Sequence, residues 1–366
     1  MLRLEPRKEI ARAMLYATPL LALVLTVLSG LILFAALGKA PLQAIELIFL
    51  SPLTNVRSLS EILVKATPLI LIATGLSIGF RAGIWNIGAE GQFTAGAMAG
   101  SAVALAVYPG GGIWLLPLMC VAAVLGGMAW AAIPALLRTR FNTNEILVSL
   151  MLVYVAVHGL SILMHGLLKD PEGFNFPQSR LFQPSALLPT LFPQDLIPGS
   201  RAHVGFLVAL AIVAAAFLLI ERHIWGLQVR VLGEAPRAAR FAGFSEQRLV
   251  WGCFMISGGL AGLAGLFEAA GPVGQLTPKL PVGYGFTAII VAFLGRLHPV
   301  GILLAGLLLA LTYIGGERAQ IAMSLPSATT SVVQGMLLFF LLASDVLVNY
   351  RVRVTKRGAR ATQPAG

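Results

Sequence analysis

The feature that most constrains this chain is a series of long apolar stretches. Leu20 to Ala36 and Leu207 to Ile220, for example, contain no charged residue. Stretches of this kind match membrane-crossing helices, because about 20 helical residues span the hydrocarbon core of a bilayer. The chain is 57% hydrophobic and 11% charged, against roughly 25% charged in soluble domains. A soluble fold is therefore excluded, and the sequence predicts an all-α polytopic membrane protein.

Hydropathy predicts about ten transmembrane helices in a single transmembrane domain, residues 1–366. The first predicted span is longer than the roughly 7 to 15 residues of a signal-peptide core, which indicates an uncleaved helix. The predicted spans are 16–37, 60–79, 88–108, 113–136, 145–167, 204–221, 249–270, 282–295, 299–315 and 328–349.

The basic residues predict how these helices are oriented. With a cytoplasmic N-terminus (1–15), the inside segments include a coupling loop (222–248) and a basic tail (350–366), and 168–203 forms a proline-rich external loop. This arrangement puts 18 of the 26 basic residues inside: Arg3, Arg7, Lys8, Arg12, Arg81, Arg138, Arg140, Arg222, Arg230, Arg237, Arg240, Arg248, Arg296, Arg351, Arg353, Lys356, Arg357 and Arg360. Both termini are thus expected in the cytoplasm. The net charge of +11 is a topology signal, and we expect no nucleic-acid partner.

The chain contains no G-x-x-x-x-G-K-[ST], no G-x-S-x-G and no H-E-x-x-H pattern, so neither a nucleotide site nor a familiar hydrolytic site can be assigned. His158 and His165 could share a helix face, but no carboxylate or cysteine at ligand spacing accompanies them. Cys120 and Cys253 lie in separate apolar stretches and are interpreted as packing residues. We predict no catalytic residue, no metal site and no cofactor in this chain.

The segment Phe80 to Phe93 interrupts two apolar runs with polar side chains and glycines. Polar, non-helical backbone at membrane depth is tolerated only where protein or water covers it. A second interruption, Gly271 to Gly285, carries three prolines, and paired interruptions in opposite halves of a transporter indicate a central translocation site. An ordinary tight loop at the cytoplasmic rim remains an alternative for the first segment. The predicted solute pathway comprises Trp85, Asn86, Glu90, Gln92, Phe93, Tyr284, Phe286 and Thr287, which offer aromatic faces and hydrogen-bonding groups.

Three sequence blocks together resemble a known family. They are FRAGIWNIGAEGQ (80–92), TNEILVSLML (143–152) and GYGFTAIIVAFLGRLHP (283–299). They are similar to permease subunits of bacterial ABC importers of the simple-sugar and nucleoside branch, and most similar to the nucleoside permeases. The resemblance extends over nearly the whole chain in the same order.

This resemblance implies a type II-like permease of about ten spans in a bacterial cytoplasmic (inner) membrane. The implied partners are a cytoplasmic ABC ATPase that binds ATP and Mg²⁺, a second permease (a related chain or a copy), an external solute-binding protein or lipoprotein, and a small-molecule solute. It also implies a coupling helix that docks on the ATPase, comprising Gly233, Glu234, Ala235, Arg237, Arg240, Phe241 and Gly243. The residues agree, because Pro236 suits a first helical turn and Gly243 can end a helix.

The resulting prediction is a permease that passes a nucleoside or a ribose-like solute inward by alternating access. Within this class, a simple sugar such as ribose is the alternative solute. An ion-coupled secondary carrier is the alternative mechanism, although mid-span carboxylates are scarce. An intramembrane enzyme that uses His158 and His165 is a third alternative.

Overall fold

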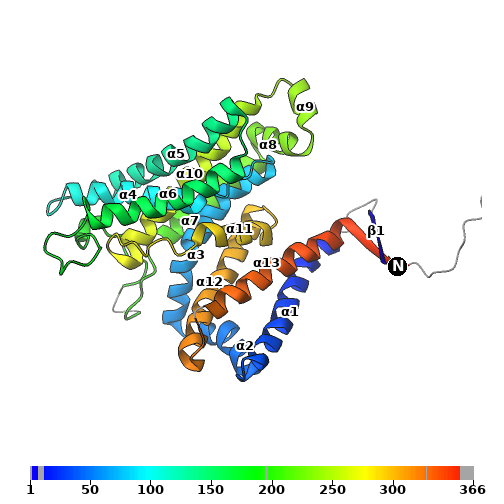
Figure 1. Ribbon diagram of the computed structural model, residues 1–366, viewed down its shortest axis with the longest axis horizontal. Coiled ribbons are helices and arrows are strands. Elements are labelled where there is room, and N and C mark those ends of the chain that lie inside the picture. Colours follow the sequence, from blue (N-terminus) through cyan, green and yellow to red (C-terminus); the bar gives the residue numbers. More distant parts are fainter. Residues whose placement is uncertain (1, 7–11, 194–196, 327, 355–366) are drawn as a thin grey trace, which may run out of the picture. The chain divides into compact units, whose positions relative to one another are not determined.

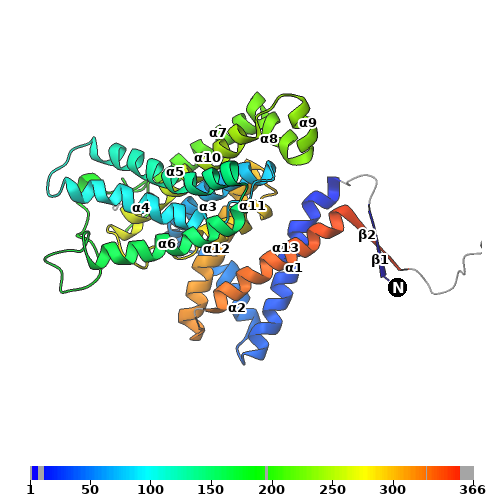
Figure 2. The ribbon, with the colours of Figure 1, turned by 45° about the horizontal axis from the view of Figure 1, so that its top comes forward.

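The computed structural model describes residues 2–6, 12–193, 197–326 and 328–354, and over these residues the chain is almost entirely helical (Figures 1 and 2). The predicted cytoplasmic ends, 1–15 and 350–366, fall partly outside the described residues. The chain divides into two compact units, Ser51–Gly315 and the combination of Met1–Leu50 with Gly316–Gly366. Each unit is described here by itself.

The larger unit contains most of the long helices. Their bounds are α3 (Val56–Arg81), α4 (Ala89–Ala106), α5 (Leu115–Phe141), α6 (Glu145–His165), α7 (Gly205–Glu221), α8 (Ile224–Glu234), α9 (Pro236–Phe241), α10 (Glu246–Glu268), α11 (Tyr284–Leu294) and the greater part of α12 (Pro299–Met323). Short 3-10 turns lie at η1 (Ser51–Leu53) and η2 (Pro184–Ala186), and a π-helical turn, η3 (Ala269–Val273), extends α10. Every predicted span in this unit coincides with one of these helices.

Several of these helices begin at a side chain that caps them. Asn55 accepts a hydrogen bond from Arg57 N at the start of α3, Asn144 accepts from Ile146 N at the start of α6, and Ser245 accepts from Arg248 N at the start of α10. Such caps satisfy backbone N–H groups that have no partner within the helix. The polar residues that separate the apolar runs thus fix where the helices begin.

Within the described residues, five helices are long and apolar enough to cross a membrane: α3, α5, α6, α12 and α10 with its extension. The pair α7 and α8, bent by 70°, would make a sixth span. Burial divides these helices into two groups, since 89% of the apolar window of α3 is buried but only 22% of those of α5 and α6. The exposed apolar faces of α5 and α6 are therefore the surfaces suited to lipid or to another membrane helix.

Glycines bring α4, α5 and α10 into backbone contact. A Cβ atom on Gly96 would overlap the backbone of Gly262, and one on Gly127 would overlap the carbonyl oxygen of Gly258. Small residues at such positions allow two helices to approach closely. Most residues of α4 are buried.

The smaller unit pairs the two ends of the chain. It contains α1 (Arg12–Ala36), α2 (Pro41–Phe49), the end of α12 and α13 (Ala328–Asn349), around a core that includes Phe34, Ile48 and Val333. Helices α1 and α13 correspond to the first and last predicted spans. The sequence did not predict α2, nor the antiparallel pair of strands β1 (Leu2–Pro6) and β2 (Tyr350–Val354).

The predicted external loop is ordered over its described residues. Backbone hydrogen bonds attach it to the end of α10 and the segment that follows, from Ser179 N to Leu276 O, from Phe182 N to Gly274 O and from Leu188 N to Ala270 O. His203, just before α7, is 2% exposed and lies beside Phe267, with ring centroids 6.3 Å apart. Its Nδ1 atom has no hydrogen-bond partner among the described residues.

This environment predicts a pH dependence of stability. Burial lowers the pKa of His203 from 6.5 to about 4, so the folded protein binds this proton less readily than the unfolded chain. The stabilisation by neutral His203 is therefore fully present above pH 6.5 and is lost as the pH falls toward 4. We expect the wild type to lose about 2 kcal/mol more unfolding free energy than His203→Gln between pH 7.5 and pH 5. Denaturant titrations in detergent test this, and identical pH dependence in both proteins would contradict it.

Candidate functional site

The segment between α3 and α4 holds a buried amide network. Asn86 Nδ2 donates to Gln92 Oε1 and to Ser257 Oγ, each at 2.9 Å, and Asn86 Oδ1 accepts from Gln92 Nε2 at 3.1 Å and from Gly88 N at 3.1 Å. Asn86 is 3% exposed and Gln92 is 1% exposed. The two predicted pathway residues therefore bond to each other and to α10, which fixes the start of α4.

Glu90 links this segment to the second interruption. Its Oε1 atom accepts a hydrogen bond from Gly283 N at 2.7 Å, and its Oε2 atom accepts from Gly285 N. These N–H groups belong to the first turn of α11, where a carboxylate satisfies free donors and interacts favourably with the helix dipole. Gly283 has a φ of 93°, which glycine adopts without a steric penalty. The two predicted interruptions thus meet at Glu90.

The predicted pathway aromatics form two separate groups. Trp85 stacks on Phe293, with centroids 5.9 Å apart, and Trp85 and Phe286 are 39% and 40% exposed. Phe93 and Tyr284 are fully buried, with centroids 5.8 Å apart. Trp85 and Phe286 are thus partly exposed, whereas Phe93 and Tyr284 are packed between helices; their contact with a solute stays a prediction.

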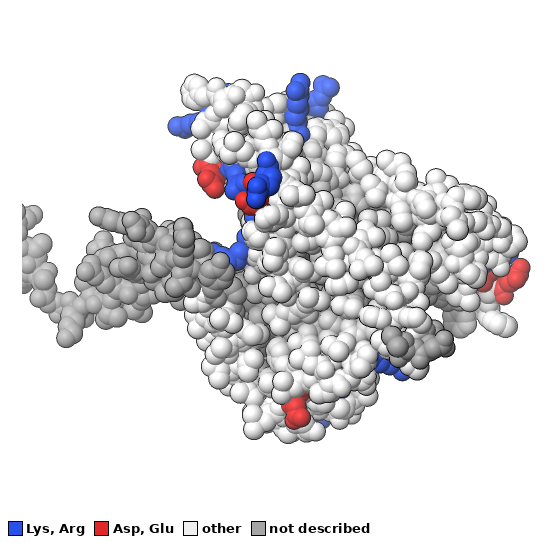
Figure 3. Space-filling model, turned by 180° about the vertical axis from the view of Figure 1, so that it is seen from behind, with Lys and Arg blue, Asp and Glu red and all other residues white. Residues whose placement is uncertain are grey.

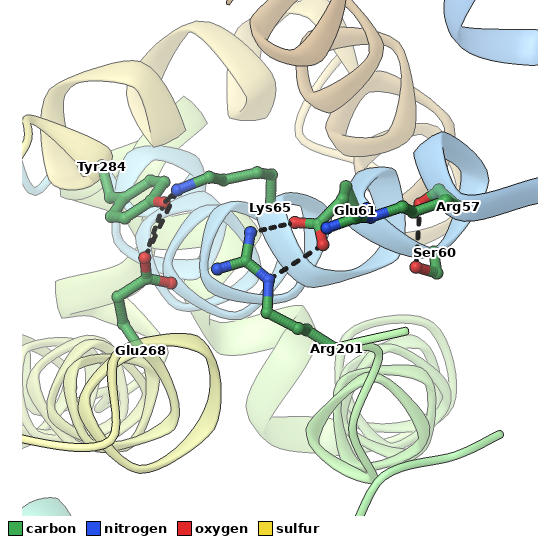
Figure 4. Close-up of polar contacts among 7 residues, drawn as sticks. All are labelled: Arg57, Ser60, Glu61, Lys65, Arg201, Glu268 and Tyr284. Atoms are coloured by element: carbon green, nitrogen blue, oxygen red, sulfur yellow. Dashed lines mark hydrogen bonds and ion pairs between the residues drawn. The ribbon is translucent and has the colours of Figure 1, made fainter. Parts of the chain in front are cut away.

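Tyr284 also takes part in a charged cluster that sequence reasoning missed. Lys65 Nζ donates to Tyr284 OH at 2.7 Å and lies 3.4 Å from Glu268 Oε1, while Tyr284 OH donates to the same oxygen at 3.0 Å (Figure 4). These residues come from α3, α11 and α10. The signal that could have found them is the presence of opposite charges in two apolar segments, because such charges pair within membranes.

A second ion pair lies on the same helix. Arg201 donates to both oxygens of Glu61, from Nε at 2.9 Å and from Nη2 at 2.6 Å. Glu61 and Lys65 are one helical turn apart, and Figure 4 shows both side chains along α3. Thr287, the remaining predicted pathway residue, is 7% exposed and lies 3.0 Å from the hydroxyl of Tyr313.

The other end of α3 lies beside α8 and α9. A Cβ atom on Gly233 would overlap the Arg81 carbonyl oxygen. The Arg81 side chain pairs with Glu221 at 3.2 Å, and Arg230 pairs with the same carboxylate at 3.4 Å. Ala239 of α9 is buried in an apolar cluster with residues of α3, α5 and α10. Helix α8 is therefore packed against α3, α7 and α10, and α9 is held by α8 and by its buried residue Ala239.

The helix predicted from Pro236 to Gly243 is present as α9. Pro236 occupies its first turn, Gly243 follows it with a φ of 75°, and Arg240 pairs with Glu246 at 3.0 Å. Arg237 is exposed, as are Glu234 and Ala235 just before the helix, and Phe241 is 94% exposed. Lys and Arg side chains gather at the end that carries these helices, at the top of Figure 3. An aromatic ring exposed in a basic setting is suited to protein contact; the coupling role of this surface stays a prediction.

Comparison with known proteins connects these features to a family. The family model "Branched-chain amino acid transport system / permease component" matches residues 58–342. The glucose ABC transporter permease protein TsgB13 of Haloferax volcanii is 38% identical over 374 residues, with 100% of this chain and 97% of that protein covered. The guanosine ABC transporter permease protein NupP of Bacillus subtilis is 29% identical over 342 residues, covering 93% and 97%. An inward-facing ABC transporter structure covers 90% of this chain and 98% of that chain at 18% identity, with a TM-score of 0.44.

The helical fold with its membrane-length apolar helices is that of a multi-pass membrane protein. The chain belongs to the family of branched-chain amino acid transport system permease components, and it is the permease subunit of an ABC importer. The resemblance to ABC importer permeases of the sugar and nucleoside branch is confirmed, but the glucose permease is more similar to this chain than the guanosine permease is. The chain is a transport component rather than an enzyme, and a permease of this class implies a partner ATPase and a solute-binding protein.

Proposed function

We propose that this permease passes a nucleoside, or a related ribose-containing solute, inward by alternating access. ATP and Mg²⁺ bind to a partner ATPase, and a second permease, a copy or a related chain, completes the pathway. An external binding protein or lipoprotein delivers the solute. The similarity to a guanosine permease supports the nucleoside. The similarity to a glucose permease, at higher identity, supports a simple sugar as the second candidate.

The observation that carries this proposal is that α8 and α9 expose some residues to solvent while others contact the rest of the larger unit. Arg237 and Phe241 are exposed, while Gly233 is in backbone contact with Arg81 and Ala239 is buried. A short helix with an exposed outer face and a fixed inner face can pass a force from a partner into α3 and α10. A solute carrier driven by an ion gradient would have no use for such a surface.

Reconstitution tests the proposal. Proteoliposomes that contain the permease, its ATPase and its binding protein are expected to take up labelled guanosine only when ATP is present. The ATP must be on the side of the membrane that carries the ATPase. Labelled glucose in parallel vesicles distinguishes the second candidate. Uptake that persists without the ATPase, and that an uncoupler abolishes, would instead support an ion-coupled carrier. Both termini are expected on the cytoplasmic side, which protease protection of terminal tags can test.

The double variant Arg237→Glu with Phe241→Ala is expected to abolish ATP-dependent uptake and the co-purification of the ATPase. The reason is that it reverses a charge and removes the large exposed ring of the docking surface, where a few such residues carry most of the binding energy. The fold should be unaffected, because both side chains are exposed.

Arg57→Glu is the matched control. Arg57 is also exposed, but it lies at the opposite end of α3 from Arg81 and α8. This variant should retain ATPase binding and uptake. Normal ATPase co-purification with the α9 double variant would contradict the docking role of α9.

A further inference from the structure

One oxygen of the Lys65–Tyr284–Glu268 cluster is left without a partner. Glu268 is 5% exposed, and its Oε1 atom faces Lys65 and Tyr284. Its Oε2 atom is buried and has no hydrogen-bond partner among the described residues. In Figure 4 this second oxygen points away from both Lys65 and Tyr284. A buried carboxylate oxygen without a donor is costly, by about 1–3 kcal/mol or more, and such a group is explained when a ligand supplies the missing donor.

Glu61, one turn away from Lys65 on α3, shows the contrast. Both of its oxygens are occupied by the Arg201 guanidinium. Two carboxylates thus lie in the same region of the molecule, one fully paired and one half paired. The unpaired acceptor at Glu268 is therefore a property of that position rather than of carboxylates in this part of the fold.

Lys65 supplies a complementary donor. An ammonium group has three N–H donors, and the two contacts of Lys65 are with Tyr284 OH and Glu268 Oε1. Its side chain is 22% exposed, against 6% for that of Glu268, so the cluster is approached from the Lys65 side. The ammonium group therefore has one N–H donor beyond its two contacts with the described residues, and the carboxylate that it contacts through Oε1 has an unpartnered second oxygen.

The charges of the cluster select the class of ligand. Lys65 and Glu268 cancel each other, and a charged solute would be repelled by one of them as strongly as it is attracted by the other. A hydroxyl group both donates and accepts a hydrogen bond. Two adjacent hydroxyls match an adjacent acceptor and donor, and ribose and simple sugars carry such vicinal diols.

We propose that Lys65 and Glu268 bind the diol of a neutral sugar or nucleoside on its way through the permease. Glu268 Oε2 accepts a hydrogen bond from one hydroxyl, and the Lys65 ammonium donates to the oxygen of the next. Tyr284 holds Glu268 Oε1 and so orients the carboxylate. This inference rests on the proposed function and names the side chains that would recognise the solute.

The first experiment separates recognition from a structural ion pair. Glu268→Gln keeps the shape but replaces Oε2 by an amide donor, and it should lower the kcat/KM of guanosine import by about 10- to 100-fold, the loss expected for a hydrogen bond to a charged group. The double variant Lys65→Met with Glu268→Met replaces the pair by apolar side chains of similar length. Such replacements of buried ion pairs are often neutral for stability. We expect the double variant to assemble with its ATPase and to melt like the wild type, yet to lose guanosine import.

Glu61→Gln is the matched control, because it removes a carboxylate charge from the same region without removing a free acceptor. It should import guanosine at a rate close to that of the wild type. Wild-type import by the Met/Met variant would overturn the inference, because the pair would then be structural only. A loss of import by Glu61→Gln equal to that of Glu268→Gln would overturn it as well, because the effect would then follow charge alone.

The second experiment varies the solute. Import of guanosine and of 2′,3′-dideoxyguanosine is compared for the wild type and Glu268→Gln, and the mutant-to-wild-type ratio is taken for each solute. The same binding protein is used throughout, so its selectivity cancels in each ratio. The ratio should be about 10- to 100-fold lower for guanosine than for the dideoxy compound. Equal ratios would overturn the inference.

A glucose-specific importer is tested in the same way with glucose and 2-deoxyglucose. A wild-type complex that imports neither guanosine nor glucose with ATP would overturn the proposed function, and the inference with it. ATP-dependent import by the wild type together with unchanged Glu268→Gln import would overturn the inference alone.

Discussion

Gly262→Ala is expected to destabilise the permease strongly, and to reduce the amount of folded protein recovered from membranes. The added Cβ would overlap the carbonyl oxygen of Ala123 and would approach the Gly127 backbone. These atoms are backbone atoms, so no side chain can rotate away to make room. The cost should reach or exceed the roughly 1–3 kcal/mol of ordinary overpacking, because α4, α5 and α10 all meet at this residue.

Gly159→Ala provides the comparison. Gly159 also lies in a membrane-length helix, α6, but no atom lies within 4 Å of the position its Cβ would take. Alanine is the better helix former by about 1 kcal/mol, so this variant should be as stable as the wild type or more stable. Thermal melts in detergent measure the difference. Equal melting temperatures for both variants would show that the close approach of α4, α5 and α10 does not support the fold.

Glu90→Ala is expected to detach the start of α11 and to abolish import. The variant removes the acceptors of Gly283 N, which is half-buried, and of Gly285 N, which is buried. A buried unsatisfied group costs about 1–3 kcal/mol, so the loss from Gly285 alone should reach that range, and the loss from Gly283 adds to it. Hydrogen exchange should become faster in the peptide that contains Gly283 to Thr287, and the melting temperature should fall.

Glu172→Ala serves as the control for Glu90→Ala. Glu172 has a side chain that is 87% exposed and pairs only with Arg180 in the described structure, and exposed pairs contribute roughly 0–1 kcal/mol. The experiment also decides between two roles for Glu90. If Glu90→Ala lost import with an unchanged melting temperature and unchanged exchange, the predicted contact with solute would explain the loss and the capping role would not.

The membrane-length helices of the larger unit were predictable because each is specified locally, whereas α8, inside the predicted coupling loop, was not predicted as a helix. An apolar run of sufficient length, bounded by a polar residue such as Asn55, Asn144 or Ser245, is enough to predict a helix and its start. Helix α9 was predictable for the same reason, from Pro236 and Gly243. Helix α2 is only nine residues long, too short for a hydropathy signal, and the strands β1 and β2 pair residues from opposite ends of the chain.

The sequence predicts which residues of the site are buried polar groups, but not which groups they bond to. The sequence indicates that Asn86, Glu90 and Gln92 are too polar to face lipid, and the structure places all three in the interior. It contains no sign that Glu90 bonds to Gly283 and Gly285, which are 193 and 195 residues away. Lys65 and Glu268 are likewise separated by 203 residues. Such contacts depend on which helices pack together, and no local pattern specifies that.

The capping of α11 by Glu90 has a mechanical consequence. Gly233 of α8 has no free space against Arg81, and the residues after Arg81 lead directly to Glu90. Glu90 in turn holds the backbone on both sides of Tyr284, whose hydroxyl touches Lys65 and Glu268. A displacement of α8 thus has a continuous covalent and hydrogen-bonded route to the Lys65–Glu268 pair. In the proposed transport cycle, this route would let a movement of the ATPase at one membrane face alter the Lys65–Glu268 pair on the far side of α11.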